Sequence, residues 1–257
     1  MKKITREEQA DGQILRLTLN APKGNVLDSI MMNSLAAALR EAEENPNLKC
    51  IVFQGAGEHF SFGASVEEHT KENAPAMLRQ FHGLFFQLMD LSVPTAALIS
   101  GQCLGGGFEL ALACDFLFAD STAVCGQPEI RLGVFAPPAS LILPFRIGQQ
   151  EASRLLLSGD SIPAERLKTL GLTGDIYPDR PTMEIEAINR LEKMLVPKSA
   201  SSLKRAVRAS RWQLNRILRK GLPDLEDLYI YDLMETNDAN EGIQAFLERR
   251  KPNWGNL

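Results

Sequence analysis

The chain has 257 residues, enough for one large domain, or a domain with a small appendage, around a sizeable core. It is 44% hydrophobic and 23% charged, and its formal net charge of −4 gives no support to nucleic-acid binding. The N-terminal lysines are followed by Glu7 and Glu8 before any apolar run develops, and no stretch approaches the roughly 18 apolar residues that cross a bilayer. We therefore expect a cytoplasmic protein that contacts neither nucleic acid nor membrane.

The first part of the chain alternates strand and helix patterns. Residues 14–19 alternate partly in polarity and lead into a loop at 20–25, which indicates a strand. Asp28 then has the side chain of a helix N-cap, and apolar residues recur at helical spacing until Pro46 ends the pattern. Residues 50–54 form a second, buried strand pattern. This order predicts a layered α/β arrangement.

A glycine-rich turn stands at the centre of the chain. The apolar run at 95–100 predicts a buried strand that ends at Gly101, and the Leu and Ala content of residues 108–114 predicts a short buried helix. The glycines at 105–107 therefore lie at a helix N-terminus, where free N–H groups and the helix dipole stabilise an oxygen that gains negative charge. The alternative is that these glycines only permit close packing of the helix on the strand.

Two carboxylic acids accompany this turn. Glu109 lies in the first turn of the apolar helix, where burial without a partner raises a carboxyl pKa and suits it to proton transfer. A helix-capping glutamate is the alternative. Glu129 lies in a turn between apolar segments, and by itself it is more typical of a solvated residue. Together the two acids indicate an active site.

Histidine and cysteine patterns give no further chemistry. The three histidines have neither metal-ligand spacing nor an acid and a nucleophile nearby, so we assign no catalytic role to His59, His69 or His82. The cysteines lie in apolar segments without C-x-x-C spacing, which favours reduced core thiols over a metal site or disulfides at Cys50, Cys103, Cys114 and Cys125. Phosphate-binding motifs for ATP or NAD are absent from the sequence.

The second half of the chain becomes helical. Two prolines in residues 130–140 predict a stiff, filled loop, and a helix follows from Pro163. Beyond Pro178 the pattern is wholly helical. Residues 204–220 carry seven Lys or Arg and no acid, which is typical of a solvated helix face and could otherwise attract an anionic ligand.

Several of these motifs carry a family resemblance. Residues 101–111, with Gly-Gln-Cys-Leu-Gly-Gly-Gly-Phe-Glu-Leu-Ala, followed by Cys114-Asp115 and by Gly-Gln-Pro-Glu at 126–129, resemble the signature of the crotonase (enoyl-CoA hydratase/isomerase) family. The resemblance runs along nearly the whole chain. It implies a spiral of ββα units and a C-terminal helical trimerisation region, which we divide into residues 1–196 and 197–257. Homotrimers, often stacked as hexamers, are the implied assembly.

The resemblance also implies a catalytic arrangement. The backbone N–H groups of Ala64 and Gly106 match the family's oxyanion hole, which stabilises a thioester enolate. Glu109 matches the acid that orients and deprotonates water, and Glu129 the acid that supplies a proton to carbon. Ser65 departs from the family, where many hydratases have aspartate. Because the donor is a backbone group, we expect the change to leave it intact and to indicate a different substrate pocket.

The remaining implied positions concern coenzyme A and the acyl group. The acyl-CoA thioester is itself the substrate, so no separate cofactor and no metal is expected. The implied binding residues are Lys23, Val26, Phe62, Ser65, Val66, Gly105, Pro128, Phe135, Phe246 and Lys251. Residues 74–91 form an apolar stripe at helical spacing, which predicts a helix. This region partly walls family pockets, but core packing is the stronger interpretation of Phe81 and Phe85.

The loop at 133–140, with its Pro-Pro pair, and residues 62–69 resemble the cyclic dienoyl-CoA hydratases of benzoyl-CoA degradation within this family. The resemblance implies hydration of cyclohexa-1,5-diene-1-carbonyl-CoA to 6-hydroxycyclohex-1-ene-1-carbonyl-CoA. The alternatives are a straight-chain enoyl-CoA hydratase of fatty-acid β-oxidation, a hydrolase or isomerase on the same fold, and a non-enzymatic RNA-binding role.

Overall fold

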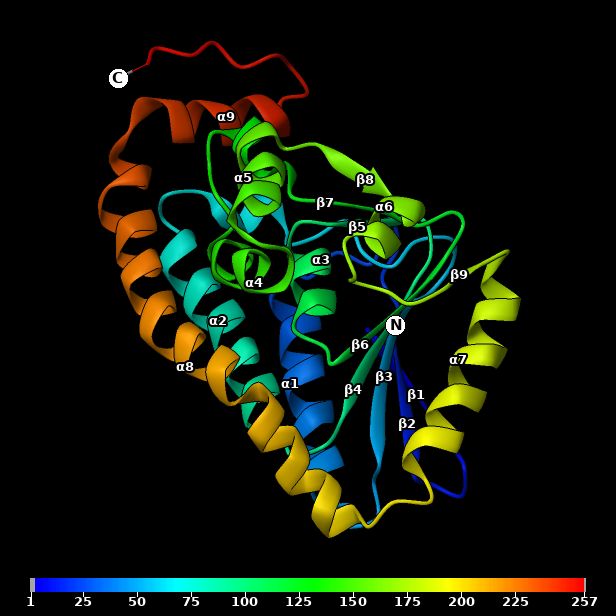
Figure 1. Cartoon of the computed structure of the whole chain (residues 1–257). Helices are drawn as coiled ribbons and strands as arrows, with labels where there is room; N and C mark the ends of the chain where they lie inside the picture. The colour runs from blue at the N-terminus through cyan, green and yellow to red at the C-terminus, as the bar shows by residue number, and fades with distance from the viewer. Residues whose placement is uncertain (1–2, 257) are drawn as a thin grey trace.

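A computed structural model describes residues 3–256 of the chain. Its main sheet has the strand order β1-β2-β3-β4-β6-β9, with β1 antiparallel to β2 and every later pair parallel (Figure 1). The bounds of these strands are Ile4–Gln9, Ile14–Leu19, Cys50–Gly55, Thr95–Ile99, Phe116–Asp120 and Ile176–Tyr177. A smaller sheet joins β5 (Gln102–Leu104), β7 (Val124–Gly126) and β8 (Ser161–Pro163).

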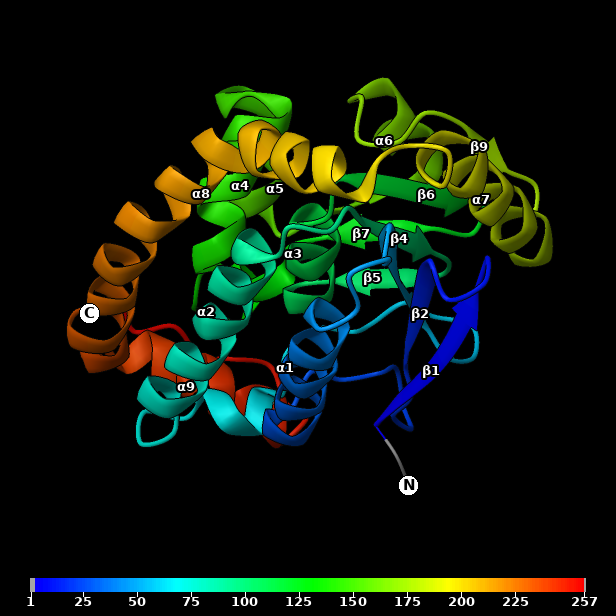
Figure 2. The ribbon, with the colours of Figure 1, turned by 90° about the horizontal axis from the view of Figure 1, so that it is seen from below.

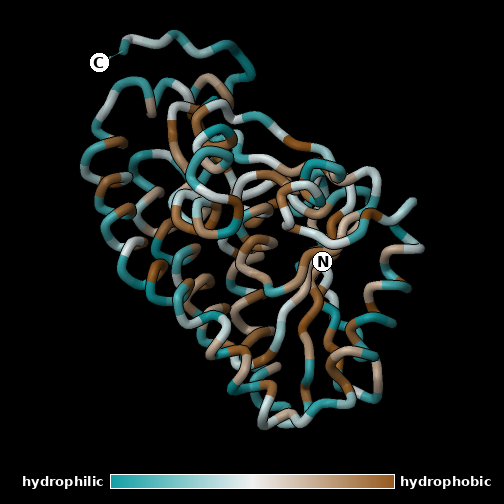
Figure 3. Tube along the Cα trace, in the orientation of Figure 1, coloured by the Kyte–Doolittle hydropathy of each residue, from teal (hydrophilic) through white to brown (hydrophobic). Residues whose placement is uncertain are grey.

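Helices cover both faces of the main sheet. One face packs against α1 (Ser29–Glu43), α2 (Ala74–Asp90) and α3 (Gly106–Leu112) through a large apolar cluster. The other face packs against α7 (Arg180–Leu195), where Ala187 and Leu191 meet Val52 and Leu98. Figure 2 shows α7 and α1 on opposite sides of the strands. The brown strands of Figure 3 lie inside a shell of helices with teal outer faces, as burial of apolar surface requires.

Strand–strand–helix units repeat along the chain. Strands β4 and β5 lead into α3, and strands β6 and β7 lead through a 3₁₀ turn (Pro128–Leu132) into α4 (Pro137–Ile147). Two further helices, α5 (Gln149–Ser158) and α6 (Ala164–Thr169), flank β8. The predicted α/β class and its ββα repetition are confirmed.

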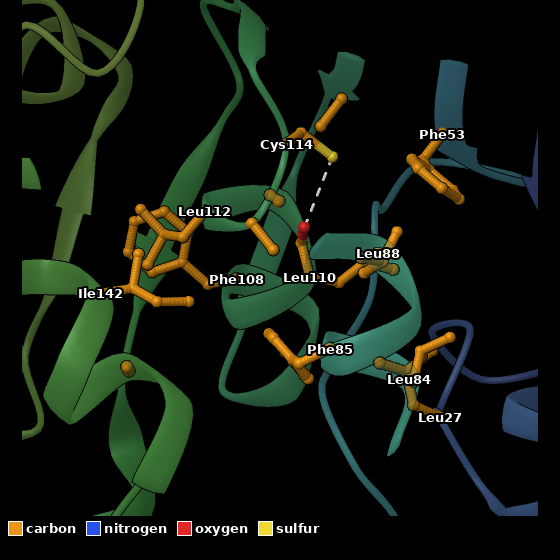
Figure 4. Packing of buried hydrophobic residues seen from close by; sticks show 14 of the residues in the cluster. Leu27, Phe53, Leu84, Phe85, Leu88, Phe108, Leu110, Leu112, Cys114 and Ile142 are labelled. Carbon is orange, nitrogen blue, oxygen red and sulfur yellow. Dashed lines mark hydrogen bonds between the residues drawn. The ribbon is translucent and has the colours of Figure 1, made fainter. Parts of the chain in front are cut away.

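The core around α3 is tightly filled. Phe108 and Leu112 of this helix pack toward Ile142, while Phe85 and Leu88 of α2 lie on its other side (Figure 4). The Cys114 thiol lies 3.4 Å from the carbonyl oxygen of Leu110 in the same view. All four cysteines are buried and free, as predicted for core thiols.

Several predicted elements are confirmed, one strand was missed and one loop was placed wrongly. The Asp28 side chain accepts from the Met31 N–H at 2.8 Å and caps α1. The strands at 14–19, 50–54 and 95–100 and the helix at 74–91 are present within one residue of their predicted bounds. Strand β1 was missed, because its exposed residues are mostly charged, as is common in edge strands.

The predicted loop at 130–140 was the second error. It ends early, because Pro137 and Pro138 form the first turn of α4. Proline is favoured there, since the first N–H groups of a helix have no internal partner. The prolines therefore start a helix rather than stiffen a loop.

The C-terminal part of the chain is built from α8 (Ala200–Tyr231), a 3₁₀ turn (Leu233–Glu235) and α9 (Asn237–Leu247). Its helical prediction is confirmed as far as residue 247, whereas residues 251–256 lack regular secondary structure. Leu214, Leu218 and Leu222 of α8 join the same apolar cluster as α3. The division at residue 196 stays a prediction. Among residues 3–256, none of the helices is long and apolar enough to cross a membrane.

The basic segment at 204–220 needs one correction. Most of its charged side chains are exposed, as predicted for a solvated face. Arg211 is only 4% exposed and forms an ion pair with Asp115. A run of like charges along a helix does not show which member faces the core, because helical periodicity places one residue in three or four inward.

Candidate active site

Two main-chain amides meet where the loop after β3 crosses the start of α3. The isolated bridges Leu27↔Ala64 and Ser61↔Cys103 fix this loop against its neighbours. A methyl group added to Gly106 would lie 3.1 Å from the Ala64 nitrogen, and one added to Gly63 would lie 3.2 Å from the Gly106 nitrogen. The two amides therefore border one small space.

Both amides are available to a ligand. Gly106 is the first residue of α3, so its N–H has no partner inside the helix. Within residues 3–256, neither this N–H nor that of Ala64 donates to a protein acceptor. Gly63 and Gly105 adopt φ angles of +104° and +49°, which side chains rarely tolerate, so glycine at these positions shapes the two amides. Two free donors at one point can bind an oxygen that gains negative charge.

Glu109 lies one turn into α3 and is buried, with 3% of its surface exposed. Its Oε1 accepts a hydrogen bond of 2.7 Å from the Ala139 N–H. Pro137 and Pro138 have no N–H, so Ala139 presents the first amide proton of α4. Burial, and next the charge of Glu129, raises the pKa of the Glu109 carboxyl well above its ordinary value, and the Ala139 N–H opposes this shift.

Glu129 reaches the same place from the 3₁₀ turn after β7. A methyl group added to Gly105 would lie 2.5 Å from Glu129 Oε1, so the carboxyl rests against the glycine turn. The buried Gln127 amide lies beside it, and when its nitrogen faces Glu129 it donates to both carboxyl oxygens at 3.1 Å. Burial raises the pKa of the Glu129 carboxyl to about 7.

The two carboxyls face one inner cavity of about 20 Å³, which also borders both amides. Two like charges in one site cannot both form easily, so the pair retains a proton near neutral pH. The site thus combines an ionised carboxylate with a protonated carboxyl. This combination can remove one proton and deliver another within a single turnover.

A larger cavity of about 420 Å³ opens outward from these groups. Its wall is mostly apolar, and Glu129 and the Ala64 turn lie on it as well as on the inner cavity. It is bounded by Phe62, Gly63, Ala64, Val66, His69, Leu104, Gly105, Pro128, Glu129, Arg131, Leu132, Val134, Ile243 and Phe246. An apolar acyl thioester fits such a wall.

The structure brings most predicted site residues to these two cavities. The outer cavity contains Phe62, Ala64, Val66, Gly105, Pro128, Glu129 and Phe246. The inner cavity contains Ala64, Gly106, Glu109, Glu129 and Phe135. Their proximity is a structural observation, whereas their catalytic and binding roles stay predictions.

Four predicted binding residues do not line either cavity: Lys23, Val26, Ser65 and Lys251. Ser65 is buried and donates to Glu67 at 2.7 Å, so its hydroxyl is already bonded. Lys23 and Lys251 are exposed, and Lys23 precedes Gly24, which contacts the Phe62 ring at the outer cavity. A role for these lysines in holding a CoA chain outside the cavity stays a prediction.

Some cavity residues were not found from the sequence. His69 lines both cavities, and burial lowers its pKa, so it is neutral near pH 7. Phe81 is core as predicted, yet it also lines the inner cavity, whereas Phe85 is core only. Tyr229 reaches the inner cavity from α8. No local motif marks these residues, because their contacts join segments far apart in the sequence.

Comparison with known proteins agrees with this geometry. Residues 9–256 match the family model described as Enoyl-CoA hydratase/isomerase. The chain therefore belongs to the enoyl-CoA hydratase/isomerase family, which confirms the predicted family and the prediction of an enzyme.

Individual relatives cover nearly the whole chain. It is 44% identical over 248 residues to the cyclohexa-1,5-dienecarbonyl-CoA hydratase of Thauera aromatica, covering 96% of this chain and 95% of that protein. It is 32% identical over 245 residues to the 2,3-dehydroadipyl-CoA hydratase of Escherichia coli, covering 94% and 95%. The solved structure of an enoyl-CoA hydratase from Mycobacterium avium aligns with a TM-score of 0.86 at 27% identity, covering 98% of each chain.

Proposed function

We propose that this protein is a hydro-lyase that adds water reversibly to cyclohexa-1,5-diene-1-carbonyl-CoA and forms 6-hydroxycyclohex-1-ene-1-carbonyl-CoA. The observation that carries this proposal is the pair of facing carboxyls, Glu109 and Glu129, beside two free amides. A hydration needs both a base and an acid at the reacting carbons, and this pair supplies both. The 44% identity to the Thauera aromatica hydratase supports the choice of substrate.

The oxyanion pair determines where water attacks. With the thioester oxygen between the Ala64 and Gly106 N–H groups, negative charge is best stabilised when the nucleophile adds to the ring carbon β to the carbonyl. That carbon is C2 of the diene. The resulting enolate is delocalised over C1, C6 and C5 of the ring.

Proton balance then fixes the product. The pair shares one proton, and in hydration the reacting state has Glu109 ionised, with its charge stabilised by the Ala139 N–H, and Glu129 protonated. Glu109 takes a proton from water as the C2–O bond forms, and the electron pair of the C1–C2 double bond moves into the enolate. Glu129 supplies a proton to C5, and the remaining double bond lies between C1 and C6. Renumbered from the carboxyl carbon, the product is the 6-hydroxy-1-ene ester. The reverse sequence releases water and restores each proton.

The shape of the site supports a compact acyl group. Beyond the carboxyls, the inner cavity is closed by Phe81, Phe135 and Pro137 together with Met77 and Leu78 of α2. The cavity of about 20 Å³ leaves no room for a long acyl chain beyond the reacting carbons. A flat six-membered ring places its reacting carbons close to the thioester and needs little depth behind them.

The deciding experiment is a mass-resolved activity screen of the purified protein with linear and cyclic enoyl-CoA esters. We expect the cyclic diene ester to gain one water, with a higher kcat/KM than crotonyl-CoA. Release of free CoA thiol without a hydrated ester would identify a hydrolase. A product of unchanged mass with a shifted double bond would identify an isomerase.

A straight-chain enoyl-CoA hydratase is the second candidate. It requires the same two carboxyls and amides, and the 32% identity to the Escherichia coli 2,3-dehydroadipyl-CoA hydratase favours it. In that event crotonyl-CoA would be hydrated with the higher kcat/KM.

We also propose a homotrimer or a pair of stacked trimers. Large apolar side chains on α8 are exposed in the single chain, with Trp212 at 57% and Tyr231 at 72%. Exposed apolar surface of this kind is often covered by another subunit. Light scattering after size exclusion measures the mass, and a monomer would contradict this assembly.

A further inference from the structure

Tyr229 is a buried polar residue that the reaction described above does not use. It lies in the last turn of α8, with 1% of its surface exposed. Within the described residues 3–256, its hydroxyl oxygen has no hydrogen-bond partner. Buried hydroxyls are nearly always bonded, because an unbonded one loses its hydration without compensation. Tyr229 therefore needs a partner that the protein itself does not provide.

The surroundings of Tyr229 point to that partner. The residue lines the inner cavity together with Glu109 and Glu129. Its ring packs against Phe135 with centroids 5.3 Å apart and an interplanar angle of 59°. Because this contact holds the ring, the hydroxyl is positioned before any ligand binds.

The inner cavity has the size of a water molecule. A cavity of roughly 10–15 Å³ holds one water, and this one measures about 20 Å³. A bound water also needs two to four polar partners. The titratable side chains that line the cavity, besides the neutral His69, are the two carboxyls and the Tyr229 phenol.

We propose that the Tyr229 hydroxyl donates a hydrogen bond to the oxygen atom that enters as water and becomes the 6-hydroxyl group of the product. This inference rests on the proposed hydratase function and adds a third contact to that site. The phenol remains protonated throughout: burial, and next the charges of Glu129 and Glu109, raises its pKa.

The contact acts differently in the two directions. In hydration, water donates toward the carboxyls, uses one lone pair to attack C2, and accepts from Tyr229 with the other. In dehydration, the C–O electron pair moves onto oxygen while Glu109 returns its proton. A donor at that oxygen stabilises the growing negative charge, as hydrogen bonds to charged groups are stronger than neutral ones.

The test is Tyr229→Phe, which removes only the hydroxyl and keeps the ring contact with Phe135. Tyr177→Phe is the matched control, because it makes the same change on strand β9, outside both cavities. For the wild-type protein's best enoyl-CoA ester, we expect Tyr229→Phe to lower kcat about 10- to 100-fold and to change KM less than about threefold. The control should keep wild-type kcat. A kcat within twofold of wild type in a folded Tyr229→Phe protein overturns the inference.

A binding measurement separates this inference from the proposed function. Calorimetry compares 6-hydroxycyclohex-1-ene-1-carbonyl-CoA with cyclohex-1-ene-1-carbonyl-CoA, two esters that differ only in the hydroxyl. The titrations use proteins that also carry Glu109→Gln, with Tyr or Phe at position 229, so that the hydroxylated ester is not dehydrated during the measurement. We expect Tyr229→Phe to weaken binding of the hydroxylated ester about 10-fold and to leave the other unchanged. If the wild-type protein hydrates no enoyl ester, the proposed function fails. The ratio of the affinities for the two esters then tests the role of the Tyr229 hydroxyl by itself. Equal affinities with Tyr and with Phe at position 229, or equal weakening for both esters, overturn the role of the hydroxyl.

Discussion

Buried ionisable side chains form two clusters in this molecule, and the clusters differ in the sign of their charges and in the number of their hydrogen bonds. Near the N-terminal ends of β4 and β6, Arg211 of α8 meets Asp115 with opposite charges. At the other ends of these strands, Glu109 and Glu129 share a cavity with like charges. The first cluster is saturated with hydrogen bonds, whereas the second has few.

Arg211 uses every part of its guanidinium group. Its Nε donates to Asp115 at 2.8 Å, and Nη2 donates to the other carboxylate oxygen. Nη1 donates to the Leu88 and Leu91 carbonyls at 2.9 and 2.8 Å. Nη2 also donates to the Val93 carbonyl at 3.1 Å and to the Thr95 hydroxyl at 2.9 Å, so one of its N–H groups is shared between two acceptors. These hydrogen bonds tie α8 to the end of α2 and the start of β4.

The carboxyl pair has the opposite balance. Glu109 accepts one backbone N–H, that of Ala139, and its nearest charged neighbour is another acid. Incomplete bonding keeps its proton affinity high, which a structural ion pair does not need. The difference teaches that burial alone does not identify catalytic groups; the number and sign of their partners do.

The largest effect is expected for Glu109→Gln, which keeps the shape of the side chain and removes its acid–base function. We expect kcat for the preferred ester to fall about 10²–10⁴-fold, because one general acid–base group contributes that much. Folding and binding of the CoA ester should be retained, which circular dichroism and calorimetry can check. Glu72→Gln, at an exposed carboxylate outside both cavities, is the control. Full activity of purified Glu109→Gln would refute the two-acid mechanism.

The next effect tests the saturated cluster. Arg211→Leu leaves Asp115 without its cationic partner and three carbonyls without their donor. Breaking one half of a buried pair typically lowers the free energy of unfolding by about 3–5 kcal/mol. We expect a thermal midpoint lower by roughly 10 °C. Chemical denaturation gives the free energy directly. A loss below about 1 kcal/mol would show that the cluster is dispensable and that the comparison drawn above is mistaken.

A third prediction concerns Glu129, whose removal should raise the free energy of unfolding near neutral pH, whereas removal of Arg211 should lower it. The reason is that burying two like-charged carboxyls is unfavourable for folding. Burial raises the pKa of Glu129 from 4.5 to about 7 in the folded protein. A raised folded pKa gives stability that is complete below the unfolded pKa and is lost as pH rises through the folded pKa. The wild-type protein should therefore lose stability between about pH 4.5 and 7 on account of this group.

Glu129→Gln removes this pH-dependent loss. We expect the variant to exceed the wild-type free energy of unfolding by about 2 kcal/mol more at pH 8 than at pH 4.5, after an allowance for the partial exposure of the group. Denaturant titrations at both pH values measure this difference. The same variant should lose most hydratase activity. A difference that is constant with pH would show that Glu129 titrates normally.

The structural features that depend on the residue pattern within one segment were predicted from the sequence. Periodicity located β2, β3, β4 and α2, and the glycines at 105–107 placed a helix start beside Glu109. A run of glycines, and an acid within an apolar segment, can each be recognised from a few neighbouring residues. The family resemblance then added Ala64, which has no local signature of its own.

Other parts depend on contacts between distant segments, which no local pattern encodes. Arg211 looks like its neighbours in a basic helix, and only the fold shows that it points toward Asp115, 96 residues away. Tyr229 meets the carboxyls because α8 crosses α2 and α4. The strands β5, β7 and β8 have three residues each, too few for a period to be measured. These features follow from tertiary packing rather than from propensity.

The smallest effect offers the sharpest control for burial. Arg219 lies on the same helix as Arg211 and pairs with Asp90, but the two side chains are 48% and 57% exposed. Arg219→Leu should lower the free energy of unfolding by about 0–1 kcal/mol, because exposed pairs gain little in water and are screened by salt. Chemical denaturation in low and in high salt measures this loss of free energy and its dependence on salt.

The two arginine variants make the same substitution eight positions apart, so helix propensity and side-chain size are matched. A loss that is several-fold larger at Arg211, and insensitive to salt, would assign the difference to burial and bonded donors. Equal losses at the two positions would instead indicate that the helix tolerates either change through relaxation. In that event burial would not distinguish a structural charge from a surface one, and the contrast with the carboxyl pair would rest on its like charges alone.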